Sequence, residues 1–170
     1  YKYRCEPTAA QAALLETWQR ACWHLQKAAI RDRRLAWQRR LTLPRLESDR
    51  AVVDGRKRRK LPTVFEQSRA MTDVRQWEEE QDERAKRRAF ISGREVQYTP
   101  EEAAQRRDNP PWYLVPRDPM EAVLWRIENA YQAFRKDPKR HGRPRWADAP
   151  ADVSLEFRGE DRGTVRWPQD

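Results

Sequence analysis

Apolar residues recur every three or four positions in three stretches of the chain, and this spacing predicts α-helices. The first stretch follows a capping box formed by Thr8 and Gln11 and extends to about Arg40. Its apolar stripe consists of Leu14, Leu15, Trp18, Cys22, Leu25 and Ala29. The second stretch begins near Val64, and its latter half is mainly charged, so we expect that half to project into solvent.

The third stretch has the most regular stripe. Its apolar residues are Met120, Val123, Leu124, Ile127, Tyr131 and Phe134. We expect Asp118 to cap this helix and Pro119 to occupy its first position. A shorter helix is expected after Thr99, with Pro100 at its first position and Glu102 at its third.

The two ends of the chain show a different pattern. Residues 1–5 ("YKYRC") and 153–157 ("VSLEF") alternate between apolar and polar positions, and this period predicts strands with one buried face. The expected fold class is therefore α+β. Residues 1–7 and 151–170 would contribute strands to a small antiparallel β-barrel, and residues 8–150 would form a mostly helical insertion. The chain opens without an initiator Met and inside a strand pattern, so we expect a fragment of a longer protein.

Charge narrows the range of functions. The 170 residues include 36 Lys and Arg against 27 Asp and Glu, and the net charge is +9. Such an excess is typical of proteins that bind polyanions, most often nucleic acid, although an ordinary solvated surface is the alternative. No apolar run approaches the ~18 residues of a membrane span, and no signal peptide is visible, so the cytoplasm is the default compartment.

The cations are gathered at particular places rather than spread evenly. They are Lys2 and Arg4 in the first expected strand; Arg20, Lys27, Arg31 and Arg34 on one face of the first helix; Arg56, Lys57, Arg58, Arg59 and Lys60 in a loop; and Lys136, Lys139, Arg140, Arg143 and Arg145 between the last helix and the following strand. We interpret these residues as contacts to a nucleic-acid backbone. The last group, in "FRKDPKRHGRPRW", is called the elbow (residues 136–146). For Arg143 and Arg145, ion pairs with carboxylates of the barrel are the alternative role.

No catalytic or metal-binding pattern is visible. The chain has no HExxH or GxSxG motif, and its 5 Gly are too few and too scattered for a phosphate-binding loop. Its 2 Cys form no CxxC motif, and its 2 His exclude a His-rich metal centre. The carboxylates lie mostly in solvated runs such as Glu78–Glu80. We therefore assign no catalytic residue, cofactor or metal to this segment.

Several stretches, in the same order, resemble one known family. "YKYRCEPTAAQAALLETWQRACWHLQKAAI" is similar to the opening of the transposon-encoded TnpB proteins and the related type V CRISPR effectors. "VFEQSRAMTDVR", "AVLWRIENAYQAFRK", "GRPRW" and "VSLEF" resemble later stretches of that family. The chain differs in three ways. Residues 41–111 form a longer segment, Trp146 replaces a Phe, and the family's nuclease domain and zinc ribbon are missing.

The resemblance implies the amino-terminal part, wedge barrel plus recognition lobe, of an RNA-guided DNA-binding protein. Its partners would be a guide RNA and target double-stranded DNA, and the protein itself would read a short flanking motif. The residues implied in that reading are Ser68, Arg117, Glu121 and Arg158, although Glu121 would equally suit the third position of a capping box. The parent would be a RuvC-type metal-dependent DNA endonuclease with Mg and a structural Zn held outside this segment, or a nuclease-dead relative. It would act in a prokaryotic cytoplasm, at the nucleoid, in transposition or antiviral defence.

Two other functions remain open at the sequence level. The chain would also suit a stand-alone basic module that binds RNA or DNA, which needs the same charges but no downstream domain. A helical scaffold or interaction protein is the second alternative, and its charges would simply be solvated.

Overall fold

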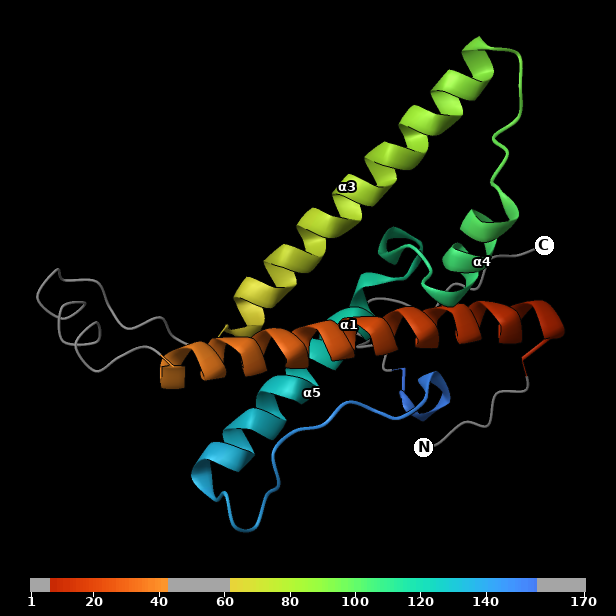
Figure 1. The fold of residues 1–170 in the computed structure, drawn as a ribbon. Coiled ribbons are helices and arrows are strands. Elements are labelled where there is room, and N and C mark those ends of the chain that lie inside the picture. Colours follow the sequence, from red (N-terminus) through yellow and green to blue (C-terminus); the bar gives the residue numbers. More distant parts are fainter. Residues whose placement is uncertain (1–6, 43–61, 156–170) are drawn as a thin grey trace, which may run out of the picture.

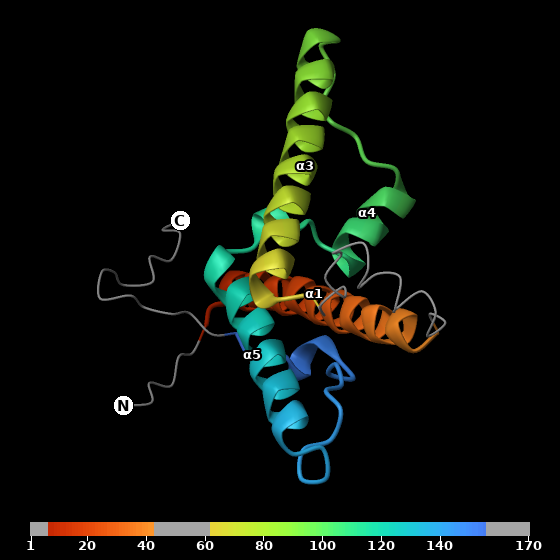
Figure 2. The same cartoon turned by 90° about the vertical axis from the view of Figure 1, so that its left-hand side faces the viewer.

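The structure is a computed structural model that describes residues 7–42 and 62–155. Within these ranges the elements are α1 (Ala9–Thr42), α3 (Val64–Ile91), α4 (Pro100–Asp108), the 3-10 turn η1 (Trp112–Leu114), α5 (Arg117–Lys136) and the 3-10 turn η2 (Pro150–Asp152). The helix α5 crosses α1, and α3 rises away from both (Figure 1). After α3 the chain descends to α4, beside the amino-terminal half of α1, and after α5 it runs back along α1 (Figure 2).

Side-chain hydrogen bonds fix the start of three helices. Before α1, the Thr8 amide donates to Gln11 Oε1 at 3.0 Å, and the Gln11 amide donates to Thr8 Oγ1 at 3.3 Å. The same reciprocal box precedes α3 and α4, with Thr63 and Thr99 as the caps. Each box satisfies amides that have no partner inside the helix. The predicted caps at Thr8 and Thr99 are confirmed, and the box at Thr63 was not predicted.

The start of α5 differs from the prediction. The helix begins at Arg117, directly after Pro116, and no side chain caps it. Asp118 therefore lies inside the first turn and is not the cap, so its carboxylate acts on the helix dipole instead. Arg135 and Lys136 in the last turn complement the other end of the same dipole.

The core lies where α5 packs against α1 and the first turns of α3. Its main side chains are Trp18, Cys22, Leu25, Ile30, Met71, Met120, Val123, Leu124 and Ile127. Each large apolar side chain that is fully buried contributes about 1.5–3 kcal/mol. The stripes predicted for α1 and α5 are confirmed, with Leu14, Leu15 and Phe134 only partly buried at their edges.

The buried thiol of Cys22 lies in this interface. It has no exposed surface, and it forms no disulfide. Burial raises the pKa of the Cys22 thiol to about 12, although the charge of Arg126 acts in the opposite direction. The thiol therefore stays protonated at neutral pH and packs as a small apolar side chain.

The helix α3 changes character along its length. Val64 and Met71 are buried near its start, whereas Phe90 near its end is 85% exposed. Ion pairs such as Arg84–Glu80, 3.3 Å, lie on the exposed part and stabilise the helix by about 0.2–0.5 kcal/mol each. The expectation that the second half of this helix projects into solvent is confirmed (Figure 1).

Although Phe65 and Trp77 on α3 are 73% and 62% exposed, the outer faces of the helices carry many charged side chains. Arg31, for example, is exposed on α1 between the buried Ile30 and Arg33. In the part of the chain that the structure describes, no helix has both the length and the apolar character needed to cross a membrane.

The predicted α+β fold class is wrong. Residues 7–42 and 62–155 contain helices and turns but no strand. Where a strand was expected from Val153, the residues up to Leu155 have no regular structure. Val153 is still buried, because it packs against α1, where Gln19 Nε2 donates to its carbonyl at 3.4 Å. The alternation in this stretch therefore reflects contact with a helix rather than with a neighbouring strand. The other expected strand positions, residues 1–5 and those beyond 155, lie outside the described residues.

Candidate nucleic-acid interface

The cations predicted on one face of α1 have different roles in the structure. Arg20 Nη1 donates to the Arg107 carbonyl at 2.7 Å, and so it ties the end of α4 to α1. Arg34 Nη2 donates to the Pro144 carbonyl at 3.3 Å and holds the elbow. These two residues lie 14 positions apart, roughly 21 Å along the helix axis. Two of the predicted phosphate contacts therefore also hold neighbouring segments in place.

The other two cations of this face are less engaged. Lys27 Nζ lies 4.0 Å above the ring of Trp23, a cation–π contact. Arg31 is exposed, and none of the residues that the structure describes forms an ion pair with it. Of the four, Arg31 has the side chain most available to a ligand.

Three of the residues implied in motif reading lie together between α3 and α5. Glu121 Oε1 accepts hydrogen bonds from Arg117 Nε at 2.6 Å and from Ser68 Oγ at 3.3 Å. The pair Arg117–Glu121 is open to solvent, with the Arg117 side chain 60% exposed. Glu121 is therefore a partner of Arg117 and not part of a capping box. The fourth residue, Arg158, lies outside the described residues.

The elbow is built on a turn at the end of α5. The side chain of Asp137 accepts hydrogen bonds from the amides of Lys139, at 3.1 Å, and Arg140, at 3.0 Å. Its carbonyl accepts from the amide of His141 at 2.9 Å. An Asp that bonds to amides just after it stabilises a tight turn. The single carboxylate of the elbow thus shapes the backbone.

The exit of the elbow is held against α1. Trp23 Nε1 donates to the Ala147 carbonyl at 2.7 Å, and the Ala147 amide donates to Gln26 Oε1 at 2.9 Å. The ring of Trp146 lies under the Arg34 guanidinium, 4.5 Å from its centroid. Trp146 therefore lies against an arginine of α1. Both ends of the elbow are therefore fixed.

Gly142 occupies an uncrowded position in the elbow. A Cβ at this position would meet nothing within 4 Å, and the residue has no positive φ. Gly142 therefore lies in open space, and its substitution would cause no steric conflict.

The cationic side chains of the elbow point into solvent. Those of Lys136, Lys139, Arg140, Arg143 and Arg145 are all exposed. Within the described residues none of them forms an ion pair, so the alternative role of Arg143 and Arg145 as partners of carboxylates has no support there. A fixed loop thus presents several uncompensated positive charges. The remaining predicted contacts, Lys2, Arg4, Arg56, Lys57, Arg58, Arg59 and Lys60, lie outside the described residues.

One buried arginine was missed by the sequence reasoning. The exposed fraction of Arg33 is 2%, and its guanidinium donates to Gln67 Oε1 at 3.0 Å and pairs with Glu128 Oε2 at 2.8 Å. Gln67 in turn donates to the Ala29 carbonyl at 3.0 Å. This network, the Arg33 junction, joins α1, α3 and α5. A signal was present, since Arg33 lies four positions after Ala29 and so continues the buried stripe of α1.

Glu128 remains ionised in this junction. Burial raises the pKa of its carboxyl. Hydrogen bonds from Gln132 and Arg33, together with the charges of Arg33 and Arg135, lower the pKa by a larger amount. The resulting pKa lies below the ordinary value for Glu. Because Arg135 also contacts Glu128 at 3.2 Å, one carboxylate serves two arginines.

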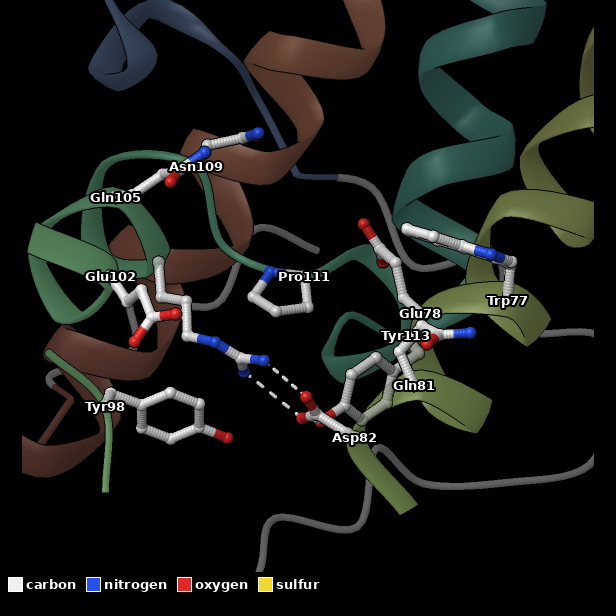
Figure 3. A pocket seen from close by; sticks show the side chains of 11 residues that line it. Trp77, Glu78, Gln81, Asp82, Tyr98, Glu102, Gln105, Asn109, Pro111 and Tyr113 are labelled. Carbon is white, nitrogen blue, oxygen red and sulfur yellow. Dashed lines mark hydrogen bonds and ion pairs between the residues drawn. The ribbon is translucent and has the colours of Figure 1, made fainter. Parts of the chain in front are cut away.

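A cavity of about 320 Å³ lies between α3, α4 and η1 (Figure 3). In its lining, Arg106 donates paired hydrogen bonds to Asp82, and Tyr113 also donates to Asp82. Arg106 lies 4.3 Å from the ring centroid of Tyr98. Glu78 accepts from the Trp112 amide at 2.6 Å. Its charged groups bond to one another and to the backbone, so we interpret this α3–α4 joint as structural.

The acid–base properties of the α3–α4 joint follow from the same contacts. The hydrogen bond from Arg106, more than any other cause, lowers the pKa of Asp82. Burial and the hydrogen bond to Asp82 raise the pKa of Tyr113 to about 12. Asp82 is therefore ionised and Tyr113 protonated at neutral pH, which is the arrangement that the ion pair requires.

Neither a metal site nor a similarity to known proteins identifies the function of the chain. In residues 7–42 and 62–155, no group of three or more His, Cys, Asp or Glu side chains could hold a metal ion. Comparisons with protein-family models, with curated proteins and with solved structures gave no match. The function is therefore argued from the residues of the chain itself.

Proposed function

We propose that this chain binds the backbone of RNA through its elbow, as part of an RNA-guided DNA-binding protein. The observation that carries the proposal is the set of exposed cations on the elbow, which none of the described carboxylates neutralises. The turn at Asp137 and the bonds of Ala147 to α1 hold the backbone that carries these charges in place before any ligand binds. A pre-organised ligand site loses less conformational entropy on binding.

The elbow suits backbone binding rather than base reading. Lys and Arg contact phosphates without regard to sequence, and such contacts position a nucleic acid while base contacts specify it. We therefore expect affinity for single strands that depends strongly on salt and weakly on sequence.

The more specific part of the proposal comes from the resemblance to TnpB and type V CRISPR effectors. In that reading the bound strand is a guide RNA, the target is double-stranded DNA, and the protein acts in a prokaryotic cytoplasm at the nucleoid. Ser68, Arg117 and Glu121 would contribute to reading the flanking motif. Cleavage, with Mg, and a structural Zn would belong to other parts of such a protein.

The competing function is that of a helical scaffold with solvated charges. The α3–α4 joint has that character, because Arg106 is matched there by Asp82. The elbow differs, because its exposed cations have no such partner in the described part of the chain. This contrast favours nucleic-acid binding at the elbow.

The test replaces Lys136, Lys139, Arg140 and Arg145 together by Gln and measures binding of single-stranded RNA against salt concentration. We expect weaker binding to all sequences. The slope of log affinity against log salt should fall by about 0.7 for each phosphate that the variant no longer binds. The matched control replaces Lys86, Arg87, Arg88 and Arg94, exposed cations at the far end of α3 and just after it, by Gln.

The control separates position from total charge. Both variants have the same reduction in charge, but only the elbow variant lacks cations on the fixed loop. Circular dichroism of each variant verifies that the helices are intact. If the two variants bind RNA equally, or if the salt slope of the elbow variant is unchanged, the elbow is not the binding site.

A further inference from the structure

A small cavity lies where the second halves of α1 and α5 meet the elbow. Its volume is about 40 Å³, and its lining includes Arg33, Arg34, Tyr131, Arg135 and Arg143. One water molecule needs roughly 10–15 Å³ of such space, so the cavity has room for about three. Its rim faces solvent, since Arg143 and Arg135 are both exposed.

The positive charges of this cavity exceed its negative ones. No carboxylate is among its lining residues, and Glu128, which pairs with Arg33 at 2.8 Å and with Arg135 at 3.2 Å, is already shared between two of its arginines. Arg34 and Arg143 have no carboxylate partner among the described residues. A cation that is partly removed from water without a counter-ion is unfavourable, and a bound anion would relieve that cost.

Two hydrogen-bond donors in the cavity are unused. Tyr131 is 7% exposed, and its hydroxyl has no hydrogen-bond partner in the part of the chain that the structure describes. The Nε of Arg34 is also buried without a partner there. The Arg34 guanidinium lies near the Tyr131 hydroxyl and lowers its pKa as a hydrogen-bond donor would, so a bond between them would use the oxygen of Tyr131 and leave its proton free to donate. Unsatisfied buried donors are rare and each one costs about 1–3 kcal/mol.

The tyrosine keeps a proton that it can donate. Burial raises the pKa of Tyr131 above its ordinary value, although the charges of Arg34, Arg33 and Arg143 lower it in part. The hydroxyl therefore keeps its proton at neutral pH. The rest of the lining is mostly apolar and includes Trp37 and Phe134, so an oxyanion would be held at the polar groups of Tyr131, Arg34 and Arg143.

We propose that this cavity binds one phosphate group of an RNA backbone, between Arg34, Tyr131 and Arg143. The inference rests on the proposed function and adds to it a specific anchoring phosphate. A phosphodiester has two non-bridging oxygens, which match the unused donors of Arg34 and Tyr131, and Arg143 at the rim completes the contact from the solvent side. The exposed elbow cations would then bind neighbouring phosphates of the same strand.

The first measurement uses inorganic phosphate and the folded chain. We expect phosphate to raise the melting temperature of the protein above that in chloride at equal ionic strength, because an anion bound to the native state stabilises it. Tyr131→Phe should abolish this increase. Without phosphate the same substitution should leave the melting temperature equal or higher, because it removes a buried donor that lacks a partner.

The second measurement uses single-stranded RNA. We expect Tyr131→Phe to lower affinity about tenfold without changing the salt slope, because it removes a hydrogen bond but no charge. Arg143→Gln should lower both the affinity and the slope, the latter by about 0.7. The control is Tyr98→Phe, the same chemical change at the α3–α4 joint, which should alter neither.

The possible outcomes separate the two proposals. RNA binding that depends on the elbow cations but not on Tyr131, with no effect of phosphate on melting, overturns the cavity and leaves the proposed function standing. A response to phosphate that requires Tyr131, without RNA binding, overturns the RNA backbone as the source of the phosphate. A tenfold loss of RNA affinity in Tyr131→Phe, with an unchanged slope, supports the proposal.

Discussion

The α3–α4 joint and the elbow each have an arginine over an aromatic ring, and they differ in what neutralises the arginine. At the α3–α4 joint, Arg106 lies 4.3 Å from the ring centroid of Tyr98 and pairs with Asp82. Beside the elbow, Arg34 lies 4.5 Å from that of Trp146 and bonds to the Pro144 carbonyl. A carboxylate cancels the charge in the first region, whereas a carbonyl only orients it in the second.

The difference separates a joint from a binding surface. At the joint, the paired charged groups neutralise each other within the chain, so a bound anion would gain little electrostatic energy there. Beside the elbow, the chain satisfies the geometry of the arginine but leaves its charge for a partner. The net charge of the sequence cannot tell a structural joint from a binding surface. Only the pairing of charges in three dimensions distinguishes the two.

The largest effect is expected at Arg33, the most deeply buried of the paired arginines. Arg33→Met removes one partner of Glu128 and the donor to Gln67, and it should lower the free energy of unfolding by about 3 kcal/mol. Urea denaturation followed by circular dichroism measures this change.

The control for this prediction is Arg31→Met on the exposed face of the same helix. It should change the free energy of unfolding by less than about 0.5 kcal/mol. Equal effects of the two substitutions would mean that the Arg33 junction contributes no more than surface charge does.

A smaller effect is expected at the α3–α4 joint. Asp82→Asn removes the charge that Arg106 and Tyr113 hold, and it should cost about 1.5 kcal/mol, since the Arg106 side chain is 35% exposed and part of the interaction is screened. Like the loss of any single carboxylate, it should raise RNA affinity by no more than about two- to threefold, because it releases only the one cation of Arg106. Urea denaturation and RNA titration of the same sample test both statements.

The pH dependence of this variant follows from the lowered pKa of Asp82. A carboxyl whose pKa is lower in the folded state contributes stability above its unfolded pKa, and that stability is lost as pH falls through the folded pKa. The wild type should therefore exceed Asp82→Asn at pH 7, and the difference should shrink below the ordinary pKa of 3.8. A difference that is constant from pH 7 to pH 3 would contradict the assignment.

The smallest effect is expected at Glu121, where a paired cation lies at the surface. Glu121→Gln releases Arg117, which should raise the affinity for double-stranded DNA about two- to threefold and steepen the salt slope by about 0.9. Stability should change by less than about 0.5 kcal/mol, because exposed pairs contribute little.

Asp118→Asn is the matched control for Glu121→Gln. It removes the same charge in the same turn of α5, but Asp118 is not the partner of Arg117. An affinity gain of equal size in both variants would mean that the effect comes from the change in net charge alone. Arg117 would then have no individual role in binding DNA.

The helices could be predicted well because their signals are local. The cap of Thr8 needs only Gln11, three residues away, and the stripe from Trp18 to Ala29 follows from the helical period alone. The expected strand at Val153 failed because alternation shows that one face is buried but not against what. Its neighbour in space is α1, more than a hundred residues earlier in the sequence.

The candidate site was predictable only in part for the same reason. The exposure of the elbow cations followed from the Pro and Gly that break the helix there. The cavity beside them did not, because it joins Arg34 on α1, Tyr131 on α5 and Arg143 on the elbow. The helical spacing placed Tyr131 in the apolar stripe of its helix and predicted a core residue. Spacing alone cannot show whether its hydroxyl has a hydrogen-bond partner.

The reactivity of the buried Cys22 thiol can report how often the core opens. Alkylating reagents attack the thiolate. In the native protein the pKa of about 12 keeps Cys22 protonated, and burial keeps the reagent away from it. Modification therefore requires α5 to separate from α1. In a Cys5→Ser background, the rate of labelling would measure how often this interface opens, including openings too brief for spectroscopy to detect.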